Sequence, residues 1–168
     1  MQAVDVSVHY LEMFCPPSQE IAAPRTGLAV AYRPMPSLEY YRTLYSLVGE
    51  EYRWLSRRKL TDAELASIIH DPLDEFHVLQ VADVDAGIAE LDFRHPGQIE
   101  IVQFGLLPGY IGQGLGKWFL DQIVQYCWSR GPDRVWLHTC TFDHPAALPN
   151  YQRAGFCLYK TEIIRREY

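Results

Sequence analysis

The sequence predicts an α/β (α+β) fold in which a mixed, mostly antiparallel twisted sheet is flanked by helices. Three consecutive strand patterns, at 76–84, 88–94 and 98–106, are separated only by short turns, which predicts an antiparallel meander. Two helical patterns precede the meander and two follow it, with further strand patterns near both ends of the chain. Strands that form a run of their own among helices are typical of an α+β domain.

Composition indicates one ordered domain over residues 1–168. The chain has 48% hydrophobic and 13% aromatic residues, which is enough for a single core. Its net charge of −6, without a long run of either sign, disfavours nucleic acid, because phosphate binding requires a basic face. No stretch approaches the roughly 18 apolar residues of a membrane span. The four cysteines include no C-x-x-C pair, so we expect a cytoplasmic protein with reduced thiols and no membrane partner.

The N-terminal region, residues 1–35, is expected to form a β-hairpin. Apolar and polar residues alternate from Val4 to Tyr10, and 28–33 is a second apolar run. The loop between them contains three prolines. The two runs would then pair with each other across this long loop.

Capping residues and breakers delimit the other elements. Ser37 is expected to cap a first helix that Gly49 ends or interrupts, and Thr61 with Glu64 forms the capping-box pattern of a second. A motif-bearing core at 76–168 follows. Its elements are expected as the meander with a turn at 85–87, a helix to Arg130, a strand at 134–140, a short helix at 146–154 and a strand at 156–167.

The stretch 101–117 organises the chain. An apolar strand runs into a Pro-Gly turn, and Gly112, Gly114 and Gly116 follow before a helix of bulky residues. Such a turn suits an anion, because glycine lets the backbone approach and the unpaired N–H groups of the first helical turn point at the ligand. A pyrophosphate is the expected guest, and a turn that merely lets strand and helix pack closely is the alternative.

Two common pyrophosphate motifs are excluded by direct count. A P-loop would require glycine at position 111 and Ser or Thr at 118, where the chain has Ile111 and Trp118. A dinucleotide fingerprint that starts at Gly112 would require a third glycine at the position of Lys117. What remains is x-x-x-G-x-G between a strand and a helix.

Two segments resemble the GNAT N-acetyltransferase superfamily. Residues 111–116, IGQGLG, resemble motif A of this family, Arg/Gln-x-x-Gly-x-Gly/Ala, with Ile111 in place of the Arg or Gln. Residues 147–156, ALPNYQRAGF, are similar to its A-x-x-x-Y-x-x-x-G-F signature. The resemblance is strongest over 76–159 and implies a GNAT fold with a sheet splayed between the fourth and fifth strands. The family often has asparagine where His144 stands, so what orders the loop 143–145 is left open.

The resemblance implies transfer of an acetyl group from acetyl-CoA to a primary amine by direct attack in a ternary complex, without a metal. The acceptor would be a small-molecule amine or a peptide amine. Alternatives are a CoA-binding or sensing domain without turnover, and a protein or peptide N-acetyltransferase. The sequence does not name the acceptor, the acyl-chain preference or the oligomeric state, and it permits a homodimer.

This chemistry requires a base for the ammonium group and a proton donor for the leaving thiolate. Glu100, eleven residues before Ile111, matches the glutamate base of the family and is the candidate base, acting directly or through water. Glu90, Asp92 or water alone are alternatives. Tyr151 matches the tyrosine of the second signature and is the candidate acid, with a core tyrosine as the alternative.

The resemblance also implies the coenzyme site. N–H groups of the β-bulge around 105–107 would meet the pantetheine and the thioester carbonyl, and those of 113–117 would meet the pyrophosphate. Ile111 cannot add a side-chain donor, so weaker CoA binding is expected. The cofactor-binding residues are therefore Gly105, Leu106, Leu107, Ile111, Gly112, Gln113, Gly114, Leu115, Gly116 and Lys117.

Acceptor contacts are expected from the loop between the first two helices. Tyr52 and Trp54 would flank an amine by cation–π contact, with Glu50 or Glu51 nearby, and aromatic packing is the alternative. The basic run 57–59 is interpreted as a solvated turn.

Four residues of metal-ligating type follow closely in one segment of the chain: His138, Cys140, Asp143 and His144. Their spacing fits no common ligand pattern, so no metal is expected. Cys140 as an acyl-carrying nucleophile, with His138 as its base, is a further alternative.

Overall fold

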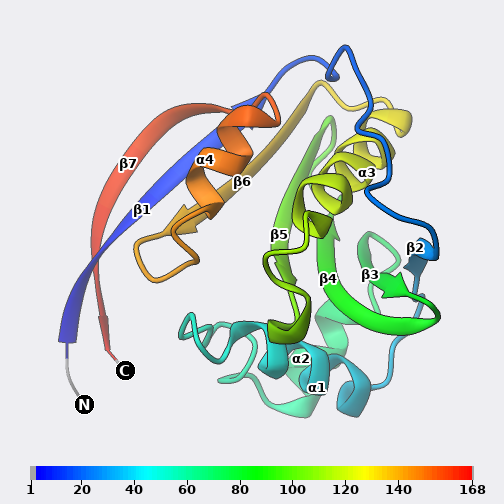
Figure 1. Ribbon diagram of the computed structural model, residues 1–168. Coiled ribbons are helices and arrows are strands. Elements are labelled where there is room, and N and C mark those ends of the chain that lie inside the picture. Colours follow the sequence, from blue (N-terminus) through cyan, green and yellow to red (C-terminus); the bar gives the residue numbers. More distant parts are fainter. Residues whose placement is uncertain (1–2, 168) are drawn as a thin grey trace.

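The computed structural model describes residues 3–167, and its centre is a seven-stranded sheet with the order β2-β3-β4-β5-β6-β1-β7 (Figure 1). All neighbouring strands are antiparallel except β5 and β6, which confirms the expected mixed, mostly antiparallel sheet. The strands are β1 (Ala3–Met13), β2 (Leu28–Tyr32), β3 (Asp74–Val81), β4 (Val84–Asp92), β5 (Gln98–Leu106), β6 (Arg134–Cys140) and β7 (Cys157–Glu167).

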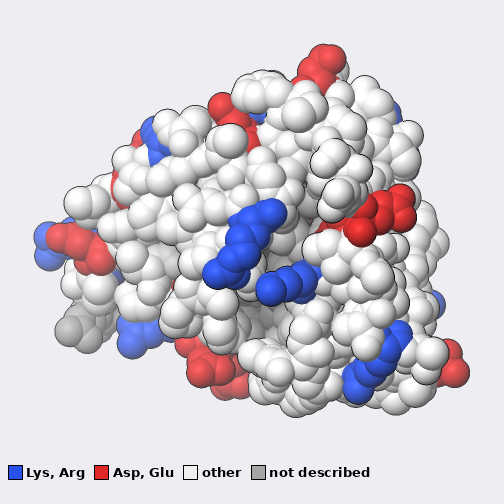
Figure 2. Space-filling view, turned by 45° about the horizontal axis from the view of Figure 1, so that its top comes forward, with Lys and Arg blue, Asp and Glu red and all other residues white. Residues whose placement is uncertain are grey.

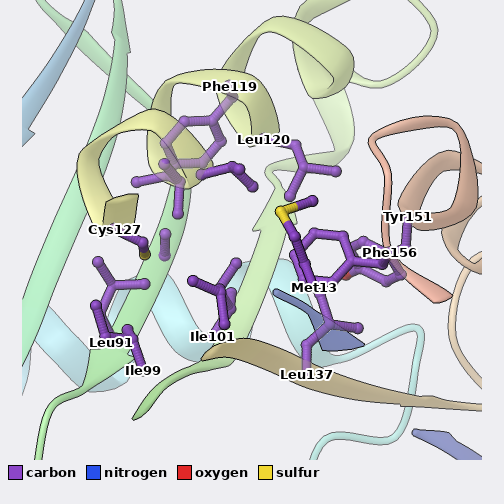
Figure 3. Packing of buried hydrophobic residues seen from close by; sticks show 14 of the residues in the cluster. Met13, Leu91, Ile99, Ile101, Phe119, Leu120, Cys127, Leu137, Tyr151 and Phe156 are labelled. Carbon is purple, nitrogen blue, oxygen red and sulfur yellow. The ribbon is translucent and has the colours of Figure 1, made fainter. Parts of the chain in front are cut away.

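Helices cover both faces of the sheet. They are α1 (Leu38–Gly49), α2 (Asp62–Ile69), α3 (Leu115–Ser129) and α4 (Ala147–Arg153), with a 3-10 turn η1 (Pro108–Tyr110) before α3. One apolar cluster joins α1 and α2 to β3 and β4, around Tyr41 and Phe76. A larger cluster joins α3 and Tyr151 of α4 to the sheet, and in Figure 3 Phe119 and Leu120 of α3 face strand residues such as Ile101.

The expected N-terminal hairpin is wrong. Strand β1 lies between β6 and β7, where His9 is opposite Thr139 on one side and Thr161 on the other. Strand β2 instead pairs with β3 at the far edge of the sheet. Hydrogen bonds to β6 and β7 satisfy backbone groups on both edges of β1, and its side chains Val6 and Leu11 are fully buried, so an interior position suits this strand better than a hairpin with β2. The loop between the two strands passes over α3 (Figure 1).

The turn between β3 and β4 also differs from expectation. Ala82 and Asp83 form it, with φ angles of 49° and 65°, instead of residues 85–87. Two successive positive φ angles match the two-residue turns that suit the twist of a hairpin. Gly87 lies inside β4, where a Cβ would stand 2.8 Å from the carbonyl oxygen of Gly105. This glycine permits close packing and makes no turn.

The two predicted helix caps are confirmed. Ser37 accepts a hydrogen bond from the N–H of Tyr40, at 3.2 Å. Thr61 and Glu64 form both halves of a capping box at the start of α2. These local signals hold because each bond joins residues within one helical turn.

The sheet opens between β5 and β6, which are fifth and sixth in the chain order of this structure. Their pairing begins at Gln98 with Arg134 and ends at Ile101 with Leu137. The remainder of each strand diverges, which forms the expected splay. No helix within residues 3–167 combines the length and the apolar character needed to cross a bilayer.

Candidate active site

A cavity of about 940 Å³ occupies the opening between β5 and β6. Its walls come from β5, the α1–α2 loop, the turn before α3, the ends of β6 and β7, and α4. This size is within the range of small-molecule and cofactor sites. Five basic residues line it, although the chain as a whole is acidic: Arg53, Arg57, Lys59, Lys117 and Arg166. Figure 2 shows Lys and Arg side chains beside a hollow in the middle of one face.

The glycine turn lies at one end of this cavity. Gly112 and Gly114 have φ angles of 80° and 77°, so the backbone itself requires glycine there. Gly114 is the N-cap of α3 and no side chain caps the helix, which leaves the first N–H groups for a ligand. The Gln113 amide braces the turn through a 2.9 Å bond to the carbonyl of Gly109.

The other predicted coenzyme residues of this turn divide between wall and core. Ile111, Gly116 and Lys117 line the cavity. Leu115 is fully buried in the core, so only its backbone is available to a ligand. Of the residues expected around a pyrophosphate, Gln113 and Leu115 do not line the cavity, because the first is exposed and the second is buried.

The edge of β5 that faces the opening offers backbone groups. The N–H of Leu107 donates to the carbonyl of Ala86 at 2.9 Å, so this N–H is not available to the pantetheine or the thioester as expected. Because hydrogen-bonded and non-bonded pairs alternate along antiparallel strands, Gly105 also directs its N–H to β4. By the same alternation, Phe104 and Leu106 direct theirs to the opening. Sequence reasoning missed Phe104, because the register with β4 decides which N–H groups of β5 point toward β4 and which point away from it.

Glu100 lies at the fork of the sheet, just behind the cavity wall. Its side chain is 17% exposed, and its Oε1 atom is 3.8 Å from Nε2 of His138, which does line the cavity. Burial, and secondly the nearby carboxylate of Asp92, raise the pKa of Glu100 to about 7. A carboxyl group with this pKa can take up and release a proton near neutral pH.

The alternative bases are both engaged. Glu90 is fully buried and accepts hydrogen bonds from Tyr41 and Arg57. Asp92 receives two bonds from the side chain of Arg94, at 2.9 and 2.8 Å. Although burial opposes it, the bonds from Arg94 lower the pKa of Asp92. Because each carboxylate is already paired with an arginine, neither is available to take a proton from an amine.

The interpretation of 57–59 as a solvated turn is wrong for Arg57. Its side chain is only 13% exposed because it pairs with Glu90. Burial alone would lower the pKa of Arg57, but Glu90 raises it above the ordinary value. The Arg57 guanidinium therefore neutralises the buried carboxylate of Glu90. The two residues are 33 positions apart in the chain, so the sequence did not indicate this pair.

Tyr151 of α4 lines the cavity and is 9% exposed. Its ring lies 6.3 Å from that of Phe104 and at the same distance from that of Phe156. Burial raises the pKa of Tyr151 well above its ordinary value, so the phenol keeps its proton at neutral pH. The residue is therefore part of the core and part of the cavity wall at once.

Asp143 orders the loop that the sequence left open. Its Oδ2 atom accepts bonds from the hydroxyl of Thr139 at 2.7 Å and from the N–H of Cys140 at 2.8 Å. Its Oδ1 atom accepts a bond from the indole of Trp54 at 3.1 Å. This last bond connects the β6–α4 loop to the α1–α2 loop across the opening of the sheet.

Two ring contacts extend this connection. The Tyr52 ring lies 6.3 Å from His144, and the Arg53 guanidinium lies 4.8 Å from the Phe142 ring. We call residues 52–54 and 142–144 the bridge. Tyr52 and Trp54 both line the cavity, and both also pack against other aromatic rings of the protein. Glu50 and Glu51 are exposed and do not line it.

Cys140 lines the cavity on the same strand as His138. Burial raises the pKa of the Cys140 thiol, which keeps it protonated and disfavours it as a nucleophile. Within residues 3–167, no three His, Cys, Asp or Glu side chains form a group that could bind a metal ion.

A mixed sheet that opens between two parallel strands, with a glycine turn at the opening, is the fold that this chain shares with solved GNAT structures. The chain belongs to the acetyltransferase (GNAT) family, whose model matches residues 41–156, more than half of the chain. A comparison with curated protein sequences gave no match.

Solved structures share this fold at low sequence identity. A GCN5-related N-acetyltransferase from Sphaerobacter thermophilus is 20% identical with a TM-score of 0.67, over 97% of this chain and 51% of that one. One from Kribbella flavida is 17% identical with a TM-score of 0.62, over 95% and 56%. The aminoglycoside acetyltransferase meta-AAC0020 from an uncultured soil sample is 14% identical with a TM-score of 0.61, over 77% and 88%. The chain thus spans about half of the first two.

Proposed function

We propose that this chain is an N-acetyltransferase that transfers an acetyl group from acetyl-CoA to a primary amine by direct attack in a ternary complex. The observation that carries the proposal is the cavity in the splayed sheet, because it brings the required groups together. The glycine turn, the open edge of β5 and Tyr151 line it, and Glu100 lies behind its wall at the fork. The groups that the chemistry requires therefore lie in the wall of one cavity or directly behind it.

The residues present fit coenzyme A. The uncapped start of α3, with Gly112 and Gly114 in left-handed conformations, suits the pyrophosphate, and Lys117 adds a positive charge. The N–H groups of Phe104 and Leu106 would bind the pantetheine arm and polarise the thioester carbonyl. When bound, the coenzyme supplies an acetyl group activated as a thioester.

The protein's own residues would handle the protons. The acceptor arrives as an ammonium ion and must lose a proton before its nitrogen can attack, and Glu100 is the carboxylate poised for that. Tyr151 keeps its proton at neutral pH and would give it to the departing sulfur. As the C–N bond forms and the C–S bond breaks, the nitrogen loses two protons, of which one ends on sulfur and one in solvent.

The acceptor is proposed to be a small amine. The bridge between Trp54 and Asp143 spans the opening of the sheet and would obstruct a folded protein surface. All four cysteines are free thiols, and Cys15 and Cys157 are exposed, which supports a reducing compartment such as the cytoplasm.

Thiol release from acetyl-CoA with a panel of primary amines tests the proposal. We expect turnover with at least one small alkylamine, and saturable CoA binding by calorimetry. Gly114→Ala should weaken that binding. Binding of CoA without thiol release from any amine would instead support a sensing domain, and absence of CoA binding would contradict both readings.

A further inference from the structure

We propose that His138 is a catalytic residue, whose imidazole receives the proton of the acceptor ammonium ion while Glu100 stabilises the resulting imidazolium from behind. This inference rests on the function proposed above and assigns the acceptor-facing base to a different side chain. It makes the base a pair of residues, one from each strand of the fork.

His138 lies at the point where strands β5 and β6 separate. Pairing of β5 with β6 ends at Ile101 and Leu137, so His138 is the first residue of β6 beyond the fork. Glu100 is opposite Trp136, two residues before His138. Side chains two apart on a strand share a face, so Glu100 and His138 lie on the same face where the strands begin to separate.

Exposure separates the roles of the two side chains. The His138 side chain is 38% exposed and lines the cavity, whereas that of Glu100 is 17% exposed and does not line it. An amine in the cavity therefore meets the imidazole before the carboxylate. Nε2 of His138 lies 3.8 Å from Oε1 of Glu100, which leaves Nδ1 as the nitrogen that can receive a proton from the cavity.

The surroundings of His138 favour its neutral form in the resting protein. Burial lowers the pKa of His138, the Asp143 carboxylate opposes this, and the Arg166 guanidinium of β7 adds to it. On the β1 side the imidazole meets the ring of Tyr10, 5.7 Å away. Neutral imidazole is the form that can accept a proton.

Charged side chains surround Glu100 and influence its ionisation. From β4 come Asp92 and Glu90, from the α1–α2 loop Arg57, and Arg94 follows β4. The two carboxylates disfavour a third negative charge on Glu100, so a positive imidazolium beside Glu100 favours its ionised form. Proton arrival on His138 and ionisation of Glu100 therefore support each other.

The proposed step balances. One N–H bond of the acceptor ammonium breaks, its electron pair stays on nitrogen, and the proton bonds to Nδ1 of His138. Glu100 is in its ionised form during this step, and its negative charge balances the imidazolium until the proton leaves to solvent, so the residue pair returns to its starting state. The nitrogen loses its second proton after the C–N bond has formed, and the sulfur gains one proton as it departs.

Kinetics on His138→Ala, with the best alkylamine of the panel and with aniline, test this role. We expect kcat for the alkylamine to fall about 100-fold, the lower range for a lost general base. Aniline is unprotonated at neutral pH, so its kcat should fall much less. Added imidazole should restore part of the alkylamine rate. His9→Ala, on the neighbouring strand β1, should behave like the wild type.

One further measurement, made on two variants, separates loss of catalysis from loss of folding. Calorimetry with CoA checks that His138→Ala and His138→Gln keep a folded coenzyme site. The inference is overturned if His138→Ala keeps the alkylamine rate within 3-fold, or if both amines lose rate equally without imidazole rescue. If the wild type releases no thiol with any amine, the proposed function fails and the inference fails with it.

Discussion

At the scale of single residues, Ile111 replaces the Arg or Gln of the family motif, and we expect this replacement to weaken CoA binding. Ile111 lines the cavity beside the glycine turn but has no polar group for a phosphate. We predict that Ile111→Arg tightens CoA binding about 10-fold, because a charge-assisted hydrogen bond contributes roughly 1.5–3 kcal/mol. Calorimetry measures this directly, with Ile111→Met as the control for size. Equal affinities of the three proteins would contradict the placement of the pyrophosphate.

The protonation of Glu100 should be visible in stability. Its pKa of about 7 in the folded protein exceeds the ordinary 4.5, so the folded state holds this proton more tightly than the unfolded state. The stability that this group contributes to the folded state is therefore fully present below about pH 4.5 and is lost as the pH rises through 7. We predict that Glu100→Gln raises Tm relative to the wild type more at pH 8 than at pH 5. A pH-independent difference in thermal melts would count against the raised pKa.

At the scale of elements, the start of α3 depends on a left-handed residue. Gly114 has a φ of 77°, and a side chain there costs roughly 1–2 kcal/mol. We predict that Gly114→Ala lowers the free energy of unfolding by about that amount and also weakens CoA binding. Gly109→Ala is the matched control, since its Cβ would meet no atom within 4 Å. Denaturant titration distinguishes the two, and equal stability of both variants would refute the argument.

At the same scale, the bridge holds the α1–α2 loop and the β6–α4 loop together. We predict that Asp143→Ala releases the loop 141–146, because three hydrogen bonds converge on this carboxylate. The free energy of unfolding should fall by about 1–3 kcal/mol, and hydrogen exchange in 141–146 should become faster. Asp143→Asn keeps one acceptor oxygen and should recover part of the protection. Unchanged exchange in Asp143→Ala would show that other contacts hold the loop.

At the scale of the whole molecule, β1 is a central strand although it begins near the N-terminus. It pairs with β7 over almost its full length and with β6 along its second half. We predict that deletion of residues 1–13 prevents folding, because β7 would lose its partner and the core would lose Leu11 and Met13. Circular dichroism and solubility measure this. A folded, cooperative truncated protein would contradict the role assigned to β1.

Much of the fold could be predicted because its signals are local. The caps at Ser37 and Thr61 and the glycine turn before α3 each depend on residues within a few positions of one another. The two signature segments located the cavity walls for the same reason. The turn after β3 was misplaced because Gly87 was interpreted as a turn residue, whereas it accommodates the carbonyl of Gly105 from the next strand.

The sequence by itself determined the elements, their order and the family resemblance, because hydrophobic period, capping and glycine spacing act between near neighbours. Only the tertiary structure decided that β1 pairs far from β2, that Arg57 neutralises Glu90, and that His138 lies in front of Glu100. These arrangements join residues distant in the chain. They follow from burial and from the need to pair buried charges, which depend on the complete sheet and on no single segment.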